Sequence, residues 1–472
     1  MALKRLLISS LLVALSTASL ILANASRKPG AREVTFSRDV APIFYEHCAA
    51  CHRPNDIAPF SVLTYRDVHP WTDSIRAKIS AREMPPWHAD PRYGDFSNDM
   101  RLSRQEIDTI ASWVTQGAKE GDPKDLPSLP KSVEGWRIGK PDIVLAMSEE
   151  YTIEAHAPDV YVYATFPMKF KEDKWVQAAE IRPGNKSIVH HVIAHVLTPE
   201  ALSGGAKRVN AEFPQAGDEA SIFYKQGSLS RVKMDAPVID DGANAANGGS
   251  LFARHTDGSG DGYSVLLASY APGKGPDTYP PGSAKKIPAG STIVLQIHYS
   301  SFHGDMKTAQ TDRTTVGLIF AKEPPAKRVV TFTVPNHFFK IPPGAANHRV
   351  TAAYTFDRDV ELIDYMPHMH LRGKDMKYEV VYPGGRRETL LWVPQFHFNW
   401  QTIYRLKTPI AIPKGARIIV TAHFDNSARN KYNPDATKAV RWGDPTYDEM
   451  MIGWLDYLVP NDDNPAVSAG HP

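Results

Sequence analysis

Apolar residues near the start of the chain follow a helical period. Between residues 36 and 51 they recur every three to four positions, which predicts a first helix that ends at Cys48-Ala-Ala-Cys51-His52. A second helix is expected after Ser103-Arg-Gln-Glu106, because this sequence is a capping box and the apolar residues that follow it share one face. The two helices predict a small all-α domain over residues 34–121.

Beyond residue 142 the pattern changes to alternating and β-branched runs, which predict strands. The clearest runs are residues 160–166, 291–298 and 417–424. Short strands broken by Pro and Gly turns favour two antiparallel, jelly-roll-like β-sandwiches, which we place at residues 142–325 and 326–458. A stretch near residues 201–288 that is rich in Gly, Ser, Asn and Pro predicts a long insertion in the first sandwich.

The expected fold is therefore multidomain, since a chain of 472 residues is too long for one core. Residues 122–141 contain several prolines and little apolar periodicity, so they predict a linker between the helical domain and the sandwiches. Residues 459–472 are expected to form a tail.

The N-terminus predicts export. Lys4 and Arg5 precede an apolar run that ends in Ala23-Asn24-Ala25, which is typical of a secretory signal peptide over residues 1–25. Later in the chain no run reaches the roughly 18 apolar residues of a membrane span. We therefore expect a periplasmic protein without a membrane span after signal cleavage; an uncleaved anchor is the alternative.

Charge argues against two classes of partner. The chain has 54 basic and 52 acidic residues, for a formal net charge of +2. Such a balance gives no electrostatic basis for binding nucleic acid or an anionic membrane.

The two cysteines of the chain belong to one motif. Cys48, Cys51 and His52 form C-x-x-C-H, in which the two thiols attach to the vinyl groups of a haem and the imidazole binds the iron. A zinc site would need a second pair of ligands, and none is visible nearby. The sequence thus predicts covalent haem c, and the helical domain resembles a class I cytochrome c.

That resemblance implies a sixth ligand in the loop before the last helix. Met84, in Glu83-Met84-Pro85-Pro86, fits best, and its thioether would raise the haem potential relative to a second histidine. The competing residues are His88, His69 and Met100.

Histidines gather in the β-rich region at predicted strands. His368 and His370 are two apart, so in a strand they face the same side and are able to chelate one metal. Adjacent His190 and His191 normally face opposite sides, and binding one ion together requires a β-bulge or different ring nitrogens. By parity alone, His191 and His195 form the better pair.

In order and rough spacing, several motifs resemble the copper type II, ascorbate-dependent monooxygenases, the family of peptidylglycine α-hydroxylating monooxygenase and dopamine β-monooxygenase. The resemblance spans about residues 142–458 and is carried by Val189-His-His-Val192, Val294-Leu-Gln-Ile-His-Tyr299, His368-Met-His-Leu-Arg-Gly-Lys374 and Asp448-Glu-Met450. It implies two sandwiches, one per copper, that face each other across a solvent-filled cleft.

The same resemblance implies the ligands of two copper ions. His190, His191 and His298 would hold one copper, and His368, His370 and Met450 would hold the other. A thioether favours Cu(I), so the site with Met450 is expected to activate O2, whereas an all-imidazole site suits an electron store. Zinc is the main rival at the all-histidine site. Additional or substitute ligands are His195, His423 and Met451.

The implied reaction is hydroxylation of a C–H bond of a small organic substrate with O2. Gln296 lies two residues before His298 on the same strand face and is a plausible support between the sites. Peptide-hydroxylating members anchor the substrate carboxylate with an arginine and a tyrosine, and here those positions are Met366 and Trp454. The substrate site is therefore expected to be more apolar.

We interpret the chain as an exported copper monooxygenase whose fused cytochrome c passes electrons to the coppers from an external donor, ascorbate or a redox protein. Haem c carries one electron at a time, and the reaction takes two single electrons. The alternatives are a non-catalytic copper-binding or electron-transfer protein, and a protein with structural zinc.

Overall fold

The computed structural model describes residues 32–54, 56–129, 135–157, 160–199, 221–225, 228–232, 264–299, 307–443 and 446–464. The expected signal peptide and most of the expected insertion and tail lie outside these residues. The chain divides into two compact units. Among the described residues no helix is long and apolar enough to cross a membrane.

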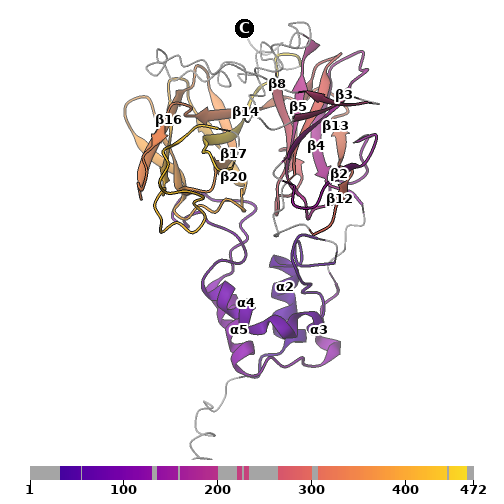
Figure 1. Ribbon diagram of the computed structural model, residues 1–472, viewed down its shortest axis with the longest axis vertical. Coiled ribbons are helices and arrows are strands. Elements are labelled where there is room, and N and C mark those ends of the chain that lie inside the picture. The colour runs from indigo at the N-terminus through magenta and orange to yellow at the C-terminus, as the bar shows by residue number, and fades with distance from the viewer. Residues whose placement is uncertain are drawn as a thin grey trace, which may run out of the picture. The chain divides into compact units, whose positions relative to one another are not determined.

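The first unit contains residues 32–53, 60–84 and 102–129, and its described elements are all helical (Figure 1). They are η1 (Phe36–Val40), α2 (Ala41–His47), α3 (Tyr65–Val68), η2 (His69–Trp71), α4 (Thr72–Ser80), α5 (Arg104–Thr115) and η3 (Pro123–Asp125). The capping box is confirmed, because Ser103 and Glu106 each bond the other's backbone N–H at the start of α5.

Aromatic side chains fill the core of this helical unit. Phe44 on α2 and Trp113 on α5 meet edge to face with ring centroids 6.4 Å apart, and Phe36 packs on both rings. The three side chains are fully buried. The apolar face of α5 seen in the sequence is therefore the face that packs on α2.

The second unit is built of strands (Figure 1), so the prediction of a mostly β-stranded chain is confirmed. Its first part contains β1 (Ile143–Ala146), β2 (Tyr151–Ile153), β3 (Val160–Pro167), β4 (Lys174–Arg182), β5 (Val189–Leu197), β6 (Ser221–Lys225), β7 (Ser228–Val232), β8 (Ser264–Tyr270), β9 (Asp277–Thr278), β10 (Ser283–Ile287), β11 (Thr292–Tyr299), β12 (Gln310–Asp312) and β13 (Thr315–Phe320). Its second part contains β14 (Lys327–Pro335), β15 (Lys340–Ile341), β16 (His348–Thr355), β17 (Val360–Met369), β18 (Gly373–Val381), β19 (Arg387–Val393), β20 (Tyr404–Ile412), β21 (Arg417–Phe424), β22 (Val440–Arg441) and β23 (Met451–Pro460).

One sheet runs through both parts of this unit. Its main path is β1-β13-β4-β10-β14-β23-β17-β20, and a separate sheet packs on each half: β7-β6-β3-β11-β5-β8 on the first and β16-β21-β18-β19 on the second. Each half thus forms a sandwich with its own apolar core. The sandwiches are not purely antiparallel, because β10 pairs with β14, and β3 with β6, in parallel.

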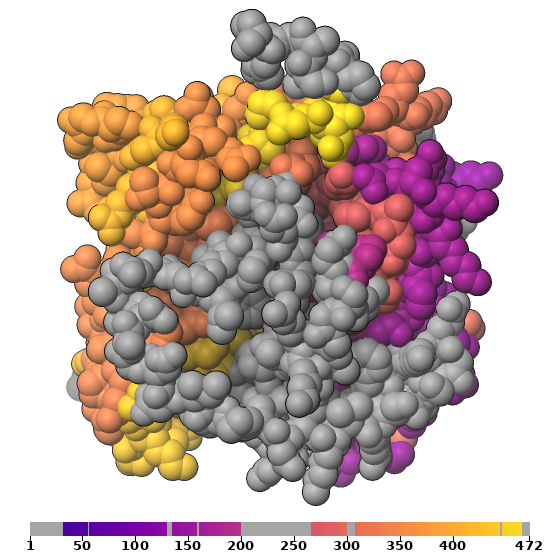
Figure 2. All heavy atoms as spheres, turned by 90° about the horizontal axis from the view of Figure 1, so that it is seen from above, coloured from indigo at the N-terminus to yellow at the C-terminus, as the bar shows by residue number. Residues whose placement is uncertain are grey.

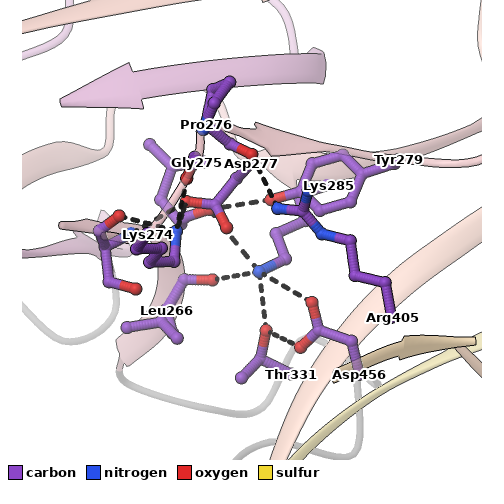
Figure 3. A network of polar contacts seen from close by, with 12 residues as sticks. Leu266, Lys274, Gly275, Pro276, Asp277, Tyr279, Lys285, Thr331, Arg405 and Asp456 are labelled. Atoms are coloured by element: carbon purple, nitrogen blue, oxygen red, sulfur yellow. Dashed lines mark hydrogen bonds and ion pairs between the residues drawn. The ribbon is translucent and has the colours of Figure 1, made fainter. Parts of the chain in front are cut away.

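Buried charges also join the two sandwiches (Figure 3). Lys285 on β10 donates to the carbonyl of Leu266 on β8 at 3.0 Å and to Thr331 on β14 at 2.6 Å, and its Nζ lies 3.6 Å from Asp456 on β23. The Lys285 side chain is 3% exposed. Burial and the Asp456 carboxylate raise the pKa of Asp364, whose Oδ1 accepts from the Asp456 backbone.

The residues that follow β23 also contact the first sandwich. In Figure 2 the last described residues (yellow) lie between orange residues of the second sandwich and purple and salmon residues of the first. Asp463 forms an ion pair with Lys286 of β10 at 2.7 Å, and the Asn461 side chain donates to the carbonyl of Pro325.

Residues 85–101, which the sequence assigned to the helical domain, belong to the second unit. We call this segment the strap. Its Phe96 forms a bridge with Leu406 of β20, and the Ser97 N–H donates to the carbonyl of Arg405 at 2.8 Å. Trp87 of the strap packs edge to face on Tyr404 at 4.9 Å and is buried in the core of the second sandwich.

A second short segment, residues 54–59, also belongs to the β unit. Its Asp56 carboxylate lies 2.9 Å from Lys186 and 3.6 Å from Arg137. The chain therefore leaves the helical unit twice, once just after His52 and once just after Met84.

Candidate metal centre

Three histidine side chains converge in the first sandwich. The Nδ1 atoms of His190 and His191 are 3.0 Å apart, and those of His191 and His298 are 3.4 Å apart. His190 and His298 are buried, and one ligand nitrogen from each of the three lies within 4.8 Å of the others.

A β-bulge in β5 makes this convergence possible. β5 pairs with β11 from Leu197 and Thr292 through His191 and His298, but Tyr299 then pairs with Val189. His190 is therefore an extra residue in the ladder, which allows two adjacent histidines to approach the same point. His195, which strand parity favoured as the partner of His191, is not in this group, because the bulge brings His190 to the cluster instead.

Nitrogens bound to one metal at about 2 Å and separated by 90–110° lie roughly 3 Å from each other. His191 Nδ1 lies 3.0 Å from His190 Nδ1 and 3.4 Å from His298 Nδ1, which is close to this spacing. Burial and the two neighbouring imidazoles lower the pKa of His191 well below its usual value, which favours the neutral form that binds metals.

Aromatic and amide side chains support this cluster. The Tyr161 ring stacks on His298 at 4.3 Å with an interplanar angle of 5°. Gln296 faces the same side of β11 as His298, and its amide donates to the Tyr163 hydroxyl at 2.9 Å. Sequence reasoning missed Tyr161, because its contact with His298 depends on the pairing of β3 with β11.

His368 and His370 lie at the end of β17, with ring centroids 5.3 Å apart. His368 Nδ1 donates to the Gln401 side-chain oxygen at 2.6 Å, and His370 Nδ1 donates to the backbone carbonyl of Asp448 at 3.2 Å. Each ring therefore leaves Nε2 for a metal, which is the arrangement usual for metal-bound histidines. Burial lowers the pKa of both rings.

Met450 lies next to this pair along the sheet. In the register of β17 with β23, Met369 pairs with Met451, so Met450 directly precedes the strand that runs beside His370. Glu449 is fully buried and accepts from the backbone N–H groups of His370 at 2.9 Å and Arg372 at 2.6 Å. Burial raises the pKa of Glu449 to about 8.

The three residues expected as additional or substitute copper ligands have other surroundings. His195 is on β5 beside Val294 of β11 and is not among the grouped residues of the first cluster, and burial lowers its pKa to about 4. His423 Nδ1 lies 2.8 Å from the Asp375 carboxylate. Met451 is fully buried in the core of the second sandwich.

One side chain contacts both clusters. Phe398, in the loop between β19 and β20, stacks on His190 at 5.1 Å and meets His370 edge to face at 6.0 Å. The centroids of the His190 and His370 rings are therefore separated by at most these two centroid distances added together. Phe398 and Gln401 have no local sequence signal, since both lie in an irregular loop.

In the helical unit, the C-x-x-C-H motif forms a tight turn after α2. The N–H groups of Cys51 and His52 both donate to the carbonyl of Cys48, and His52 Nδ1 donates to the carbonyl of Phe60 at 3.1 Å. His52 Nε2 is thereby left for an iron ligand. Burial raises the pKa of the Cys48 thiol to about 12. The motif residues fit covalent haem c, because they present an imidazole nitrogen and two thiols that form no disulfide.

The residues proposed as sixth ligand are spread over both units. Met84 ends a segment of the helical unit and is partly buried, and His69 in η2 packs on Tyr65 at 5.1 Å. His88 is part of the strap and stacks on His397 at 6.3 Å. Burial and His397 lower the pKa of His88 to about 4. Met100 packs against the core of the second sandwich.

Similar solved structures include an infectious bursal disease virus VP2 subviral particle (6% identity, TM-score 0.19, 69% of this chain and 74% of that chain). Others are PNGF-II (10% identity, TM-score 0.26, 67% and 65%) and a putative secreted protein from Eubacterium rectale (11% identity, TM-score 0.18, 63% and 69%). Likenesses of this size carry no argument. No curated protein matches the chain.

A family model matches one part of the chain, which is less than a third of its length. This part contains the His368–His370 pair, Met450 and the loop with Phe398. Residues 330–470 match the C-terminal domain of copper type II ascorbate-dependent monooxygenase.

Proposed function

We propose that this protein is an exported copper monooxygenase that hydroxylates a C–H bond of a small organic substrate. The observation that carries the proposal is the presence of two clusters of histidines, one in each sandwich, of which the second lies in the part that matches the family. In the reaction one oxygen atom of O2 enters the C–H bond and the other leaves as water, with two electrons and two protons consumed.

The residues present fit copper at both places. Three Nδ1 atoms converge at His190, His191 and His298, while His368 and His370 offer Nε2 and Met450 lies opposite His370 when the register of the sheet is continued by one residue. Copper bound there would activate O2 and supply single electrons. Burial favours the neutral imidazoles of His368 and His370, and their Nδ1 partners orient both rings.

The substrate side of the second site is apolar. Met366 and Trp454 are paired across β17 and β23, and Met366 lies two residues before His368 on the same face of the strand. Both are partly buried. A neutral substrate held by apolar contact fits these residues better than a carboxylate, which would find no cation at this pair.

In this proposal the helical unit receives electrons from the donor and passes them to the coppers. Cys48, Cys51 and His52 would hold haem c with Met84 as the sixth ligand, and an external donor, ascorbate or a redox protein, would reduce it. The C-x-x-C-H motif and the N-terminal pattern of the sequence both support a periplasmic location.

The proposal is tested with holoprotein matured in a host that attaches haem c. We expect two copper ions per chain and ascorbate-dependent O2 uptake with a hydroxylated product. Both the uptake and one copper are lost in a double variant, His368→Ala with His370→Ala. Copper binding without product from a broad set of apolar substrates would instead support the non-catalytic electron-transfer alternative, and zinc without copper would support a structural site.

A further inference from the structure

The loop at residues 394–403 reaches from the second sandwich to the first. Phe398 stacks nearly parallel on His190, with an interplanar angle of 16°, and meets His370 nearly perpendicularly, at 88°. Both distances lie in the range of favourable aromatic pairs. The same ring is thus in contact with a ligand of each proposed copper.

This loop is held in place from several sides. The Phe396 N–H donates to the carbonyl of Lys374 at 2.8 Å, and His397 Nε2 lies 3.2 Å from the Tyr432 hydroxyl. Gln401 of the same loop bonds His368 at 2.6 Å. The backbone on both sides of Phe398 is therefore fixed relative to the second histidine cluster.

The loop also touches the first sandwich at a second point. Gly273, in the turn after β8, has φ +79°, and a Cβ placed on it would come within 3.3 Å of the Trp400 ring. Glycine suits this position because it adopts a positive φ without strain and leaves room for the Trp400 ring. Phe398 and Trp400 thus give the loop two contacts with the first sandwich.

We propose that Phe398 is a positioning residue that sets the spacing of the two histidine clusters and the rate of electron exchange between metals bound there. This inference rests on the proposed function, since it needs a metal in each cluster. Electron transfer slows steeply with distance and is slower across water than through packed atoms. A ring in contact with both His190 and His370 fixes their spacing and occupies space that water would otherwise fill.

The test uses EPR of the oxidised holoprotein, in which the dipolar coupling between two Cu(II) ions measures their distance without turnover. The wild-type protein is expected to give one narrow distance distribution. Phe398→Ala should give a broader and longer one, because the contacts with His190 and His370 are lost. Phe398→Tyr retains the ring and should restore the narrow distribution, whereas Phe398→Leu fills volume without stacking and should not.

Phe338→Ala is the matched control, because Phe338 is 64% exposed and should leave the distance unchanged. Hydroxylation by Phe398→Ala is expected to fall by about 10²-fold, the scale of a 1 Å misplacement, with copper content unchanged. Two coppers at an unchanged distance in Phe398→Ala would overturn the role of Phe398 and leave the proposed function unaffected. A wild-type protein that binds fewer than two coppers would overturn the proposed function, and this inference with it.

Discussion

The partner of each ring nitrogen determines what a histidine is able to bind. His368, His370 and His52 all donate from Nδ1 to an oxygen, so each presents Nε2. His190 and His191 instead bring their Nδ1 atoms together. Residue type suggested metal binding in both places, but the nitrogen involved depends on neighbours that are distant in sequence.

The hydrogen bond from His368 to Gln401 is open to a direct test. Gln401→Leu removes the acceptor that orients the ring, and we expect copper affinity at this site to fall by about 10–100-fold. Competition titration with a copper chelator measures the affinity. Gln395→Leu is the control, since Gln395 is exposed on the same loop. Equal affinities in the two variants would show that Gln401 does not orient the ligand.

His195 predicts a pH dependence of stability. Burial holds its pKa at about 4 in the folded protein, below the usual 6.5, so the unfolded chain takes up a proton first as the pH falls. The free energy of unfolding is therefore expected to decrease between pH 6.5 and 4 and to be unaffected by His195 above this window. In His195→Gln the slope should be smaller by up to about 1.4 kcal/mol per pH unit. Denaturant titrations of metal-free protein at several pH values measure it, and an unchanged slope would contradict the assignment.

At the scale of elements, the strands could be predicted more fully than their pairing. The alternation near residues 160–166, 291–298 and 417–424 is found in β3, β11 and β21. Nothing local in Val189-His-His-Val192 shows that His190 is an extra residue, because a bulge is defined by the partner strand. The parallel pair of β10 with β14 is likewise a product of the tertiary fold.

The strap was not distinguishable from the helical domain by pattern, because it has no strands or helices of its own. Its place is set by Trp87, Ala89 and Phe96, which are buried in the core of the second sandwich. Such isolated apolar residues in a Pro-rich loop carry no period that would assign them to one domain or the other.

Trp87 gives a measurable estimate of how strongly the strap is held. Trp87→Ala should lower the free energy of unfolding by about 3–5 kcal/mol, since it removes a buried ring packed on Phe96 and Tyr404. Trp87→Phe should cost much less, because the indole N–H has no hydrogen-bond partner among the described residues. Chemical denaturation followed by far-UV circular dichroism compares the two variants without relying on tryptophan fluorescence. Equal losses in the free energy of unfolding would contradict this packing.

At the scale of the whole molecule, the charge network of Figure 3 holds the sandwiches together. Lys285→Met leaves Asp456 without its buried cation, and we expect a loss of about 3–5 kcal/mol in the free energy of unfolding. Its neighbour Lys286 pairs with Asp173 and Asp463 at the surface, so Lys286→Met should cost about 0–1 kcal/mol. Denaturant titration measures both. A similar loss in the two variants would argue that the network contributes little beyond a surface pair.

The two short segments that leave the helical unit restrict how this protein could be rearranged. Fused domains are usually exchanged by cutting one linker, but here residues 54–59 and the strap, which fall between parts of the helical unit, belong to the β unit. Excising the helical unit as a continuous stretch would remove Trp87 and Phe96 from the core of the second sandwich. Recombination could therefore not have swapped the helical part freely once this interleaving existed, and the two parts are expected to be inherited together.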